Sequence, residues 1–268
     1  MIGHPRFELG DVVLFKTEDG INTGFICTVD ADGRFDQRDD AYYVVYSVDC
    51  NILWNPVADE SVIDRLGSIN ETDRILLRPF VHEDYEAMYN NWAADKRVTQ
   101  YLTWEAHENV LITVAVIDNW IKEYKENNRK NWAIVLKKKE EPIGSISVIN
   151  EEKKIINSGY YKTAEIGYCI GANWWRQGLM TETVRRVLWF LFGTMGYDEV
   201  IAVHDTENVA SGEVMKKAGM TFDRIGYNEG RNNRGVVDIA IYRATRKEWL
   251  NGEVCKEEIR SIKGRKHD

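Results

Sequence analysis

The chain has 268 residues, of which 44% are hydrophobic and 29% are charged, and its net charge is −8. An acidic chain is a poor general ligand for nucleic acid, and no window of 18 uncharged apolar residues offers a membrane span. We therefore expect a protein without membrane or nucleic-acid partners. The length predicts two domains, and residues 1–10 lack the apolar core of a signal peptide, which predicts a cytoplasmic location.

The cysteines and histidines show none of the spacings typical of metal sites. No two cysteines form a Cys-x-x-Cys pair, and the five histidines are scattered along the chain. We expect reduced thiols and no metal. The cysteines are Cys27, Cys50, Cys169 and Cys255.

Residues 1–68 are predicted to form a separate, small all-β module. Three short segments rich in Val, Phe and Tyr are divided by turn signals, and they cover Asp11–Lys16, Gly24–Val29 and Tyr42–Val48. Their order resembles small Src-homology-3-like barrels. A short helix is expected over Asp59–Leu66, ended by Gly67-Ser68.

The aromatic residues of this module allow two interpretations. Tyr42, Tyr43 and Trp54 could be exposed anchors that recognise a partner or substrate. They could equally fill a small core or pack on the second domain.

A second domain is expected from residue 73 to about residue 250, with strands alternating with helices as in a mixed-sheet α+β domain. A charged tail, predicted to be frayed, follows over residues 251–268. The predicted strands are 74–79, 131–137, 142–150, 166–170, 198–203, 221–227 and 236–243, the last two joined by a loop over 228–235. The predicted helices begin near 82, 105, 179 and 207.

The stretch Glu165–Met180 is the centre of this domain. A short apolar strand over 166–170 is followed by Trp174-Trp175, a turn at 176–178 and a helical pattern. A strand, a glycine turn and a helix start expose backbone N–H groups, and the helix dipole favours negative charge there. The pattern predicts an anion site, and Gly178 would let the chain approach a phosphate closely.

The same stretch resembles the acetyl-CoA motif of the GCN5-related N-acetyltransferases, the GNAT family. The branch that it is most similar to comprises the ribosomal-protein alanine N-acetyltransferases, which are RimJ/RimL-like. The motifs that carry the resemblance are Glu165-Ile166-Gly167-Tyr168, Trp174-Trp175, Arg176-Gln177-Gly178-Leu179-Met180-Thr181, Asn208-Val209-Ala210-Ser211 and Lys217-Ala218-Gly219-Met220.

The resemblance implies the GNAT fold, an acetyl-CoA cosubstrate and direct transfer of the acetyl group to an amine. In that fold, the strand with Glu165 and the strand at 198–203 splay apart to admit the cofactor. The implied cofactor-binding residues are Tyr168, Cys169, Ile170, Arg176, Gln177, Gly178, Leu179, Met180, Thr181, Asn208 and Ser211.

The resemblance also implies the chemistry. Glu165 is the expected base, because burial of a carboxylate raises its pKa toward neutrality; alone, it could equally be a strand-end carboxylate in water. Ser211 is the expected acid for the departing thiolate, because Met215 stands where many family members have a tyrosine. Asn208 suits a helix N-cap as well as a cofactor contact. Tyr101 and Trp104 lie in a loop that borders the acceptor pocket in the family, although plain packing explains them equally well.

Two functions follow from these residues. The first is an N-acetyltransferase acting on a protein N-terminus or on a small-molecule amine. Whether the chain is a monomer or a homodimer stays open at this point. The second is a catalytically inactive acyl-CoA-binding regulator or scaffold whose β-module is the working part.

Overall fold

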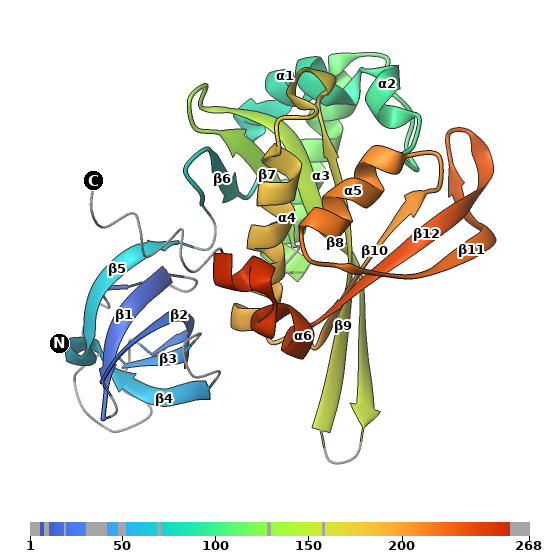
Figure 1. Cartoon of the computed structure of the whole chain (residues 1–268). Coiled ribbons are helices and arrows are strands. Elements are labelled where there is room, and N and C mark those ends of the chain that lie inside the picture. The colour runs from blue at the N-terminus through green and yellow to red at the C-terminus, as the bar shows by residue number, and fades with distance from the viewer. Residues whose placement is uncertain are drawn as a thin grey trace. The chain divides into compact units, whose positions relative to one another are not determined.

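The computed structural model describes residues 6–7, 11–18, 20–30, 42–47, 52–68, 71–127, 130–156 and 159–257. It separates into two compact units, each coloured along the chain in Figure 1. The first comprises residues 1–70, 186–198 and 246–268, and the second comprises residues 71–185 and 199–245. Within the described ranges, no helix combines the length and the apolar character needed to cross a membrane.

The N-terminal part of the first unit is a five-stranded antiparallel sheet. Its strands have the order β4-β3-β2-β1-β5, and its core contains Val13, Phe15, Ile26, Tyr43 and Val45, each fully buried. The strands are β1 (Asp11–Thr17), β2 (Gly20–Asp30), β3 (Tyr42–Ser47), β4 (Ile52–Ala58) and β5 (Val62–Ser68), with a short 3-10 helix η1 at Asp59–Ser61.

Two details of this sheet decide open expectations. The expected helix over Asp59–Leu66 is wrong beyond Ser61, because the β-branched pair Val62-Ile63 begins a strand that pairs with β1. Tyr43 is buried, with its hydroxyl bonded to Asp59, and Trp54 packs partly buried against the same core. These two rings therefore fill the core and are not exposed anchors. The side chain of Tyr42 and the turns at 31–41 lie outside the described residues.

The second unit is built on a seven-stranded sheet of order β11-β12-β10-β9-β8-β7-β6. All neighbours are antiparallel except β9 and β10. The strands are β6 (Ile75–Arg78), β7 (Asn131–Leu136), β8 (Glu141–Ile156), β9 (Gly159–Ile170), β10 (Glu199–Asp205), β11 (Thr221–Asn232) and β12 (Gly235–Thr245).

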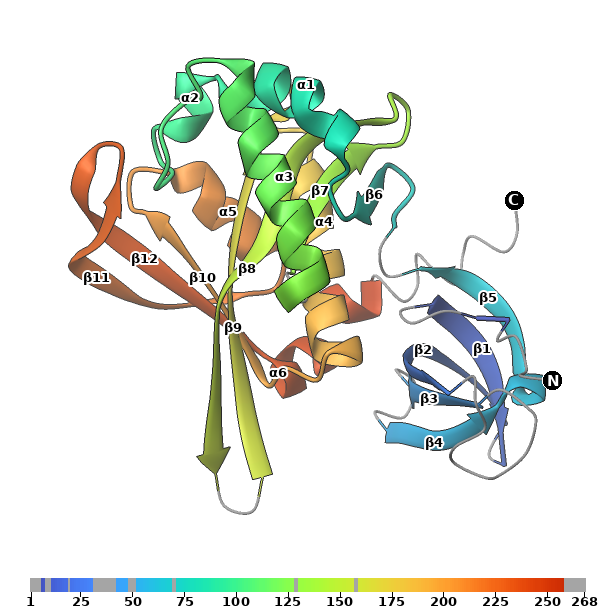
Figure 2. The same ribbon diagram turned by 180° about the vertical axis from the view of Figure 1, so that it is seen from behind.

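Helices cover both faces of this sheet, as Figures 1 and 2 show from opposite sides. One face carries α1, α2 and α3, whose core residues include Met88, Trp92 and Ile117. The other face carries α5 and the start of α4. The bounds are η2 (His82–Asp84), α1 (Tyr85–Met88), η3 (Tyr89–Ala93), α2 (Lys96–Thr99), α3 (Val110–Asn127), η4 (Ala172–Trp174), α4 (Leu179–Trp189), η5 (Phe190–Thr194), α5 (Val209–Lys217) and α6 (Arg246–Asn251).

Several boundaries differ from the predictions. The strands β8 and β9 run past the rest of the sheet as a long two-stranded ribbon, in which Lys153 pairs with Lys162 and Ile155 with Tyr160. The expected loop over 228–235 is mostly strand, because β11 and β12 stay paired up to Asn232 and Gly235. The tail is not frayed from residue 251, since residues 253–257 are helical. Polar, charged sequences gave little apolar periodicity from which these extensions could be recognised.

The β8–β9 pairing depends on close backbone contact at Gly144. A Cβ at this position would lie 2.3 Å from the Cys169 carbonyl oxygen and 2.9 Å from the Ile170 Cα. We predict that Gly144→Ala lowers the free energy of unfolding by about 3 kcal/mol, because rigid backbone atoms must move.

Urea denaturation measures this change, with Gly159→Ala as the matched control. Gly159 lies in β9, where a Cβ would have no neighbour within 4 Å, so its free energy of unfolding should change by less than about 0.5 kcal/mol. Equal losses in the two variants would show that packing against β9 is not the cause.

Candidate functional site

The parallel pairing of β9 with β10 stops halfway along both strands. The ladder runs from Thr163 and Glu199 to Ile166 and Ala202, although β9 continues to Ile170 and β10 to Asp205. Beyond Ile166, β9 remains paired with β8 on its other side. Its edge toward β10 therefore carries backbone N–H and C=O groups that no strand partner satisfies. The splaying expected from the family resemblance is present.

A cleft of about 690 Å³ lies at this splayed end. Its walls are the end of β9, the turn before α4, the first turns of α5 and the segment 97–102. The structure thus brings together most of the predicted site residues from four separate parts of the chain. Those that line the cleft are Tyr101, Tyr168, Cys169, Ile170, Arg176, Gly178, Leu179, Met180, Thr181, Asn208 and Ser211.

The turn before α4 has a left-handed backbone. Arg176 and Gly178 have φ values of 60° and 77°, and the Glu182 N–H donates to the Gly178 carbonyl at 3.1 Å to begin the helix. The N–H groups of the first helical turn have no partner within the helix. Together with the helix dipole, they favour an anion at this wall of the cleft.

Arg74, which the sequence did not single out, holds this turn in place. Its Nη1 donates to the Gln177 carbonyl at 3.0 Å, and its Nε donates to the Glu182 carboxylate at 2.8 Å. Thr72 also bonds to Glu182. The segment just before β6 therefore fixes the turn, although the two are more than 100 positions apart in the chain. Gln177 does not line the cleft, because its side chain donates to the Asn173 carbonyl at 2.9 Å.

Tyr168 and Ser211 meet across the cleft. The Tyr168 hydroxyl donates to the Ser211 carbonyl at 3.1 Å, and the Ser211 hydroxyl donates to the Tyr168 oxygen at 3.0 Å. Burial raises the pKa of Tyr168 above its ordinary value, so the phenol stays protonated at neutral pH. Asn208 accepts from the Ser211 N–H at 3.4 Å as the N-cap of α5. Met215, a residue of α5, is 1% exposed, so its side chain is buried.

Glu165 lies on β9 just before the strand leaves β10. It shares a face of the strand with Cys169, and Cys169 packs against the cluster beneath α1 and α3. Burial raises the pKa of the Glu165 carboxyl above its ordinary value of 4.5, since the charged form loses solvation. Glu165 itself does not line the cleft. Burial also raises the pKa of the Cys169 thiol, so a thiolate nucleophile is disfavoured.

The two residues of the predicted acceptor loop, Tyr101 and Trp104, lie in different environments. Tyr101 lines the cleft, and the Arg234 guanidinium lies 5.5 Å from the centre of its ring. Trp104 does not line the cleft and packs half-buried against the α1–α3 cluster. Other lining residues lacked any motif that would have identified them, namely Arg97, Val98, Gln100, Leu102, Glu207, Glu213 and Val214.

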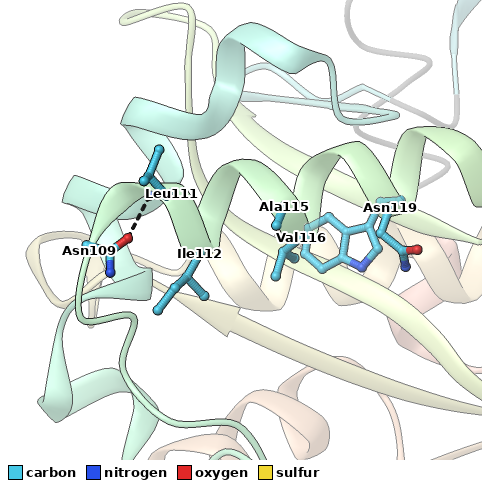
Figure 3. A pocket seen from close by; sticks show the side chains of 7 residues that line it. Asn109, Leu111, Ile112, Ala115, Val116 and Asn119 are labelled. Carbon is cyan, nitrogen blue, oxygen red and sulfur yellow. Dashed lines mark hydrogen bonds between the residues drawn. The ribbon is translucent and has the colours of Figure 1, made fainter.

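A second hollow lies on α3, at residues 109–120 (Figure 3). It has a volume of about 670 Å³, and one helix and the residue before it supply all of its walls. Its lining residues are Asn109, Leu111, Ile112, Ala115, Val116, Asn119 and Trp120, none of which titrates near neutral pH. It offers no acid, base or nucleophile and contains none of the predicted site residues.

The family of the second unit follows from comparison with known proteins. A model described as an acetyltransferase (GNAT) domain matches residues 74–221. The uncharacterized N-acetyltransferase YoaA of Bacillus subtilis (strain 168) is 31% identical over 151 residues, which cover 56% of this chain and 81% of that protein. A second N-acetyltransferase of that organism, YnaD, is 28% identical over 154 residues, covering 56% and 80% of the two chains.

Solved structures share the fold of the second unit. The microcin C7 self-immunity acetyltransferase MccE, solved with acetyl-CoA and AMP, matches with a TM-score of 0.56 and 20% identity over 65% of this chain and 93% of its own. A ribosomal-protein-S5-alanine acetyltransferase from Vibrio fischeri matches with a TM-score of 0.56 and 15% identity over 67% and 97%.

The half-buried carboxyl of Glu165 makes stability depend on pH. Because its pKa is raised in the folded protein, the folded state keeps a proton that the unfolded state loses above pH 4.5. We predict that wild-type stability falls, relative to Glu165→Gln, as the pH rises from 4.5 through the folded-state pKa, and that the difference is constant above it.

Urea denaturation of both proteins between pH 4 and pH 8 measures this difference. Glu152→Gln, at an exposed position in β8, is the control and should follow the wild type across the range. A wild type that gains stability over Glu165→Gln as the pH rises would contradict the prediction.

Proposed function

We propose that the splayed cleft binds acetyl-CoA. The premise is that this chain belongs to the GNAT acetyltransferase family and is an N-acetyltransferase that uses acetyl-CoA. The observation that carries the proposal is the end of the β9–β10 ladder at Ile166 and Ala202, beside the turn at Gly178. Relatives that are N-acetyltransferases give no support to the inactive-scaffold alternative.

The residues of the cleft fit two parts of this cofactor, the pyrophosphate and the pantetheine arm. The N–H groups of the first turn of α4 suit its pyrophosphate. The free edge of β9 beyond Ile166 suits its extended pantetheine amides, in the way that a peptide adds to a sheet edge. Bound acetyl-CoA supplies an activated acetyl thioester. A direct transfer does not require Cys169 as a nucleophile. The raised pKa of its thiol agrees with this, because it disfavours the thiolate.

Each proton step is assigned to a residue of this chain. Glu165 accepts the proton of the acceptor amine, through a water, because it lies just outside the cleft. Its raised pKa brings it closer to the ideal for a base near neutrality. Backbone N–H groups on the edge of β9 that faces away from β8, near Tyr168 and Cys169, stabilise the negative charge on the carbonyl oxygen. The Ser211 hydroxyl, whose proton is donated to the Tyr168 oxygen at rest, turns to give that proton to the departing sulfur and takes another from solvent water.

The acceptor is a primary amine, either a protein N-terminus, as in the ribosomal-protein alanine branch, or a small molecule. We assign residues 1–68 to a separate Src-homology-3-like module and residues 73–250 to the catalytic domain. Since Tyr43 and Trp54 belong to the module's own core, recognition by the module would use other residues.

Replacement of the base is the direct test of catalysis. We predict that Glu165→Gln lowers turnover by about 10²- to 10⁴-fold, because a positioned general base contributes on that scale. The measurement is release of free thiol from acetyl-CoA in the presence of a panel of amines, comprising peptides with free N-termini, polyamines and amino acids. Glu152→Gln should keep full activity, and unchanged turnover in Glu165→Gln would exclude Glu165 as the base.

Cofactor binding is tested at the turn. A saturating ligand at about 100 times its dissociation constant stabilises the native state by about 2.7 kcal/mol, so acetyl-CoA should raise the melting temperature of the wild type and of Glu165→Gln. We predict a smaller rise in Gly178→Ala, because a side chain at φ 77° is strained and displaces the turn. Gly159→Ala should respond like the wild type. An undiminished rise in Gly178→Ala would remove the turn from the cofactor site.

A further inference from the structure

The turn between β11 and β12 is bonded to the segment that forms one wall of the cleft. The Asn233 N–H donates to the Leu102 carbonyl at 3.1 Å. Its side-chain Nδ2 donates to the Thr99 carbonyl at 3.0 Å and to the Trp104 carbonyl at 2.7 Å. The two partners lie at the same end of the unit in both views, where α2 and the β11–β12 hairpin approach each other (Figures 1 and 2).

These three bonds use every donor of this asparagine. The side-chain amide has two N–H groups and the backbone has one, and all three point at carbonyls of a single loop, residues 99–104. Asn233 is exposed, so its packing contributes little to the core. Its contacts serve to fix the position of the loop.

The next residue adds a second tie to the same wall. Arg234 pairs with the buried carboxylate of Asp205 at 3.2 Å and with Glu207. Its guanidinium lies over the Tyr101 ring, at a distance typical of cation–π contacts. Tyr101 and Glu207 both line the cleft. The turn at Asn233 and Arg234 therefore contacts two side chains that line the cleft, Tyr101 and Glu207, and also the backbone of residues 99–104.

Two walls of the cleft differ in the chemical groups that they present. The wall at residues 176–181 presents helix N–H groups suited to phosphate, which leaves the wall at residues 97–102 to the other substrate. This second wall contains Tyr101 and Leu102, and it is the wall to which Asn233 is bonded.

We propose that Asn233 is a positioning residue that determines recognition of the acceptor amine and leaves cofactor binding unchanged. The proposal rests on the proposed function. Loss of its side-chain bonds frees the loop, so the acceptor must order Tyr101 on binding and its KM rises. The cofactor wall lies on other elements and keeps its affinity.

Two substitutions give a graded test in the full-length protein. Asn233→Ala removes both side-chain donors, and Asn233→Asp replaces them with a carboxylate that faces two carbonyl oxygens. With the amine of highest turnover from the panel, we expect the acceptor KM to rise about 10-fold in Asn233→Ala and further in Asn233→Asp. The KM for acetyl-CoA and the kcat should stay within about 2-fold of the wild type.

The matched control is Asn119→Asp, which adds the same charge at the hollow on α3 and away from the cleft. It should leave both KM values unchanged. An unchanged acceptor KM in both Asn233 variants, or an equal rise in the KM for acetyl-CoA, would overturn the proposal.

Hydrogen exchange provides a readout that does not need turnover. We expect amide exchange in residues 99–104 to be at least about 10-fold faster in Asn233→Ala than in the wild type, with residues 176–186 unchanged. If acetyl-CoA stabilises the protein but no amine reacts, the exchange result still tests the bonds of Asn233. Unchanged exchange in residues 99–104 overturns the proposal, whereas absence of any acetyl-CoA effect counts against the proposed function instead.

Discussion

The chemistry of this protein depends on a hydrogen-bond ladder that ends early. β9 and β10 are parallel partners only as far as Ile166 and Ala202. A sheet that closed to its end would satisfy the backbone of β9 and leave no edge for an extended ligand. Because the ladder stops, one strand presents a free backbone edge to the cleft while β8 keeps it rigid on the other side. The Tyr168–Ser211 contact lies beyond the end of the ladder, and Glu165 belongs to the last paired positions before it.

The part of this arrangement that lies in one continuous segment of the chain could be predicted from the sequence. The apolar run 166–170, the glycine turn and the helix after it are adjacent in the chain, so their pattern predicts a phosphate-binding wall. The family resemblance correctly added the GNAT fold. The roles of Glu165 and Ser211 remain predictions, and the structure adds to them a half-buried carboxyl with a raised pKa and a hydroxyl that bonds to Tyr168.

The remaining parts could not be predicted, because they depend on contacts between distant segments. Arg74 reaches the turn across 103 positions and Asn233 reaches Trp104 across 129; neither residue belongs to a motif. The same limit applied to the N-terminal sheet, where pairing with β1 made a strand of Val62-Ile63. The different environments of Tyr101 and Trp104 could not be predicted either, because an aromatic residue in a loop has the same local signal whether it lines a cleft or packs on a core.

The bonds of Arg74 and Asn233 also affect how the domain folds. Contacts between residues so far apart in sequence close large loops, and the entropy of that closure slows folding. Asn233 is synthesised after most of the sheet, so the wall at residues 99–104 waits for the last hairpin of the domain. A chain that ends at β10 contains the turn at residues 176–178 and the Arg74 that bonds to it, but it lacks every bond from Asn233 to residues 99–104.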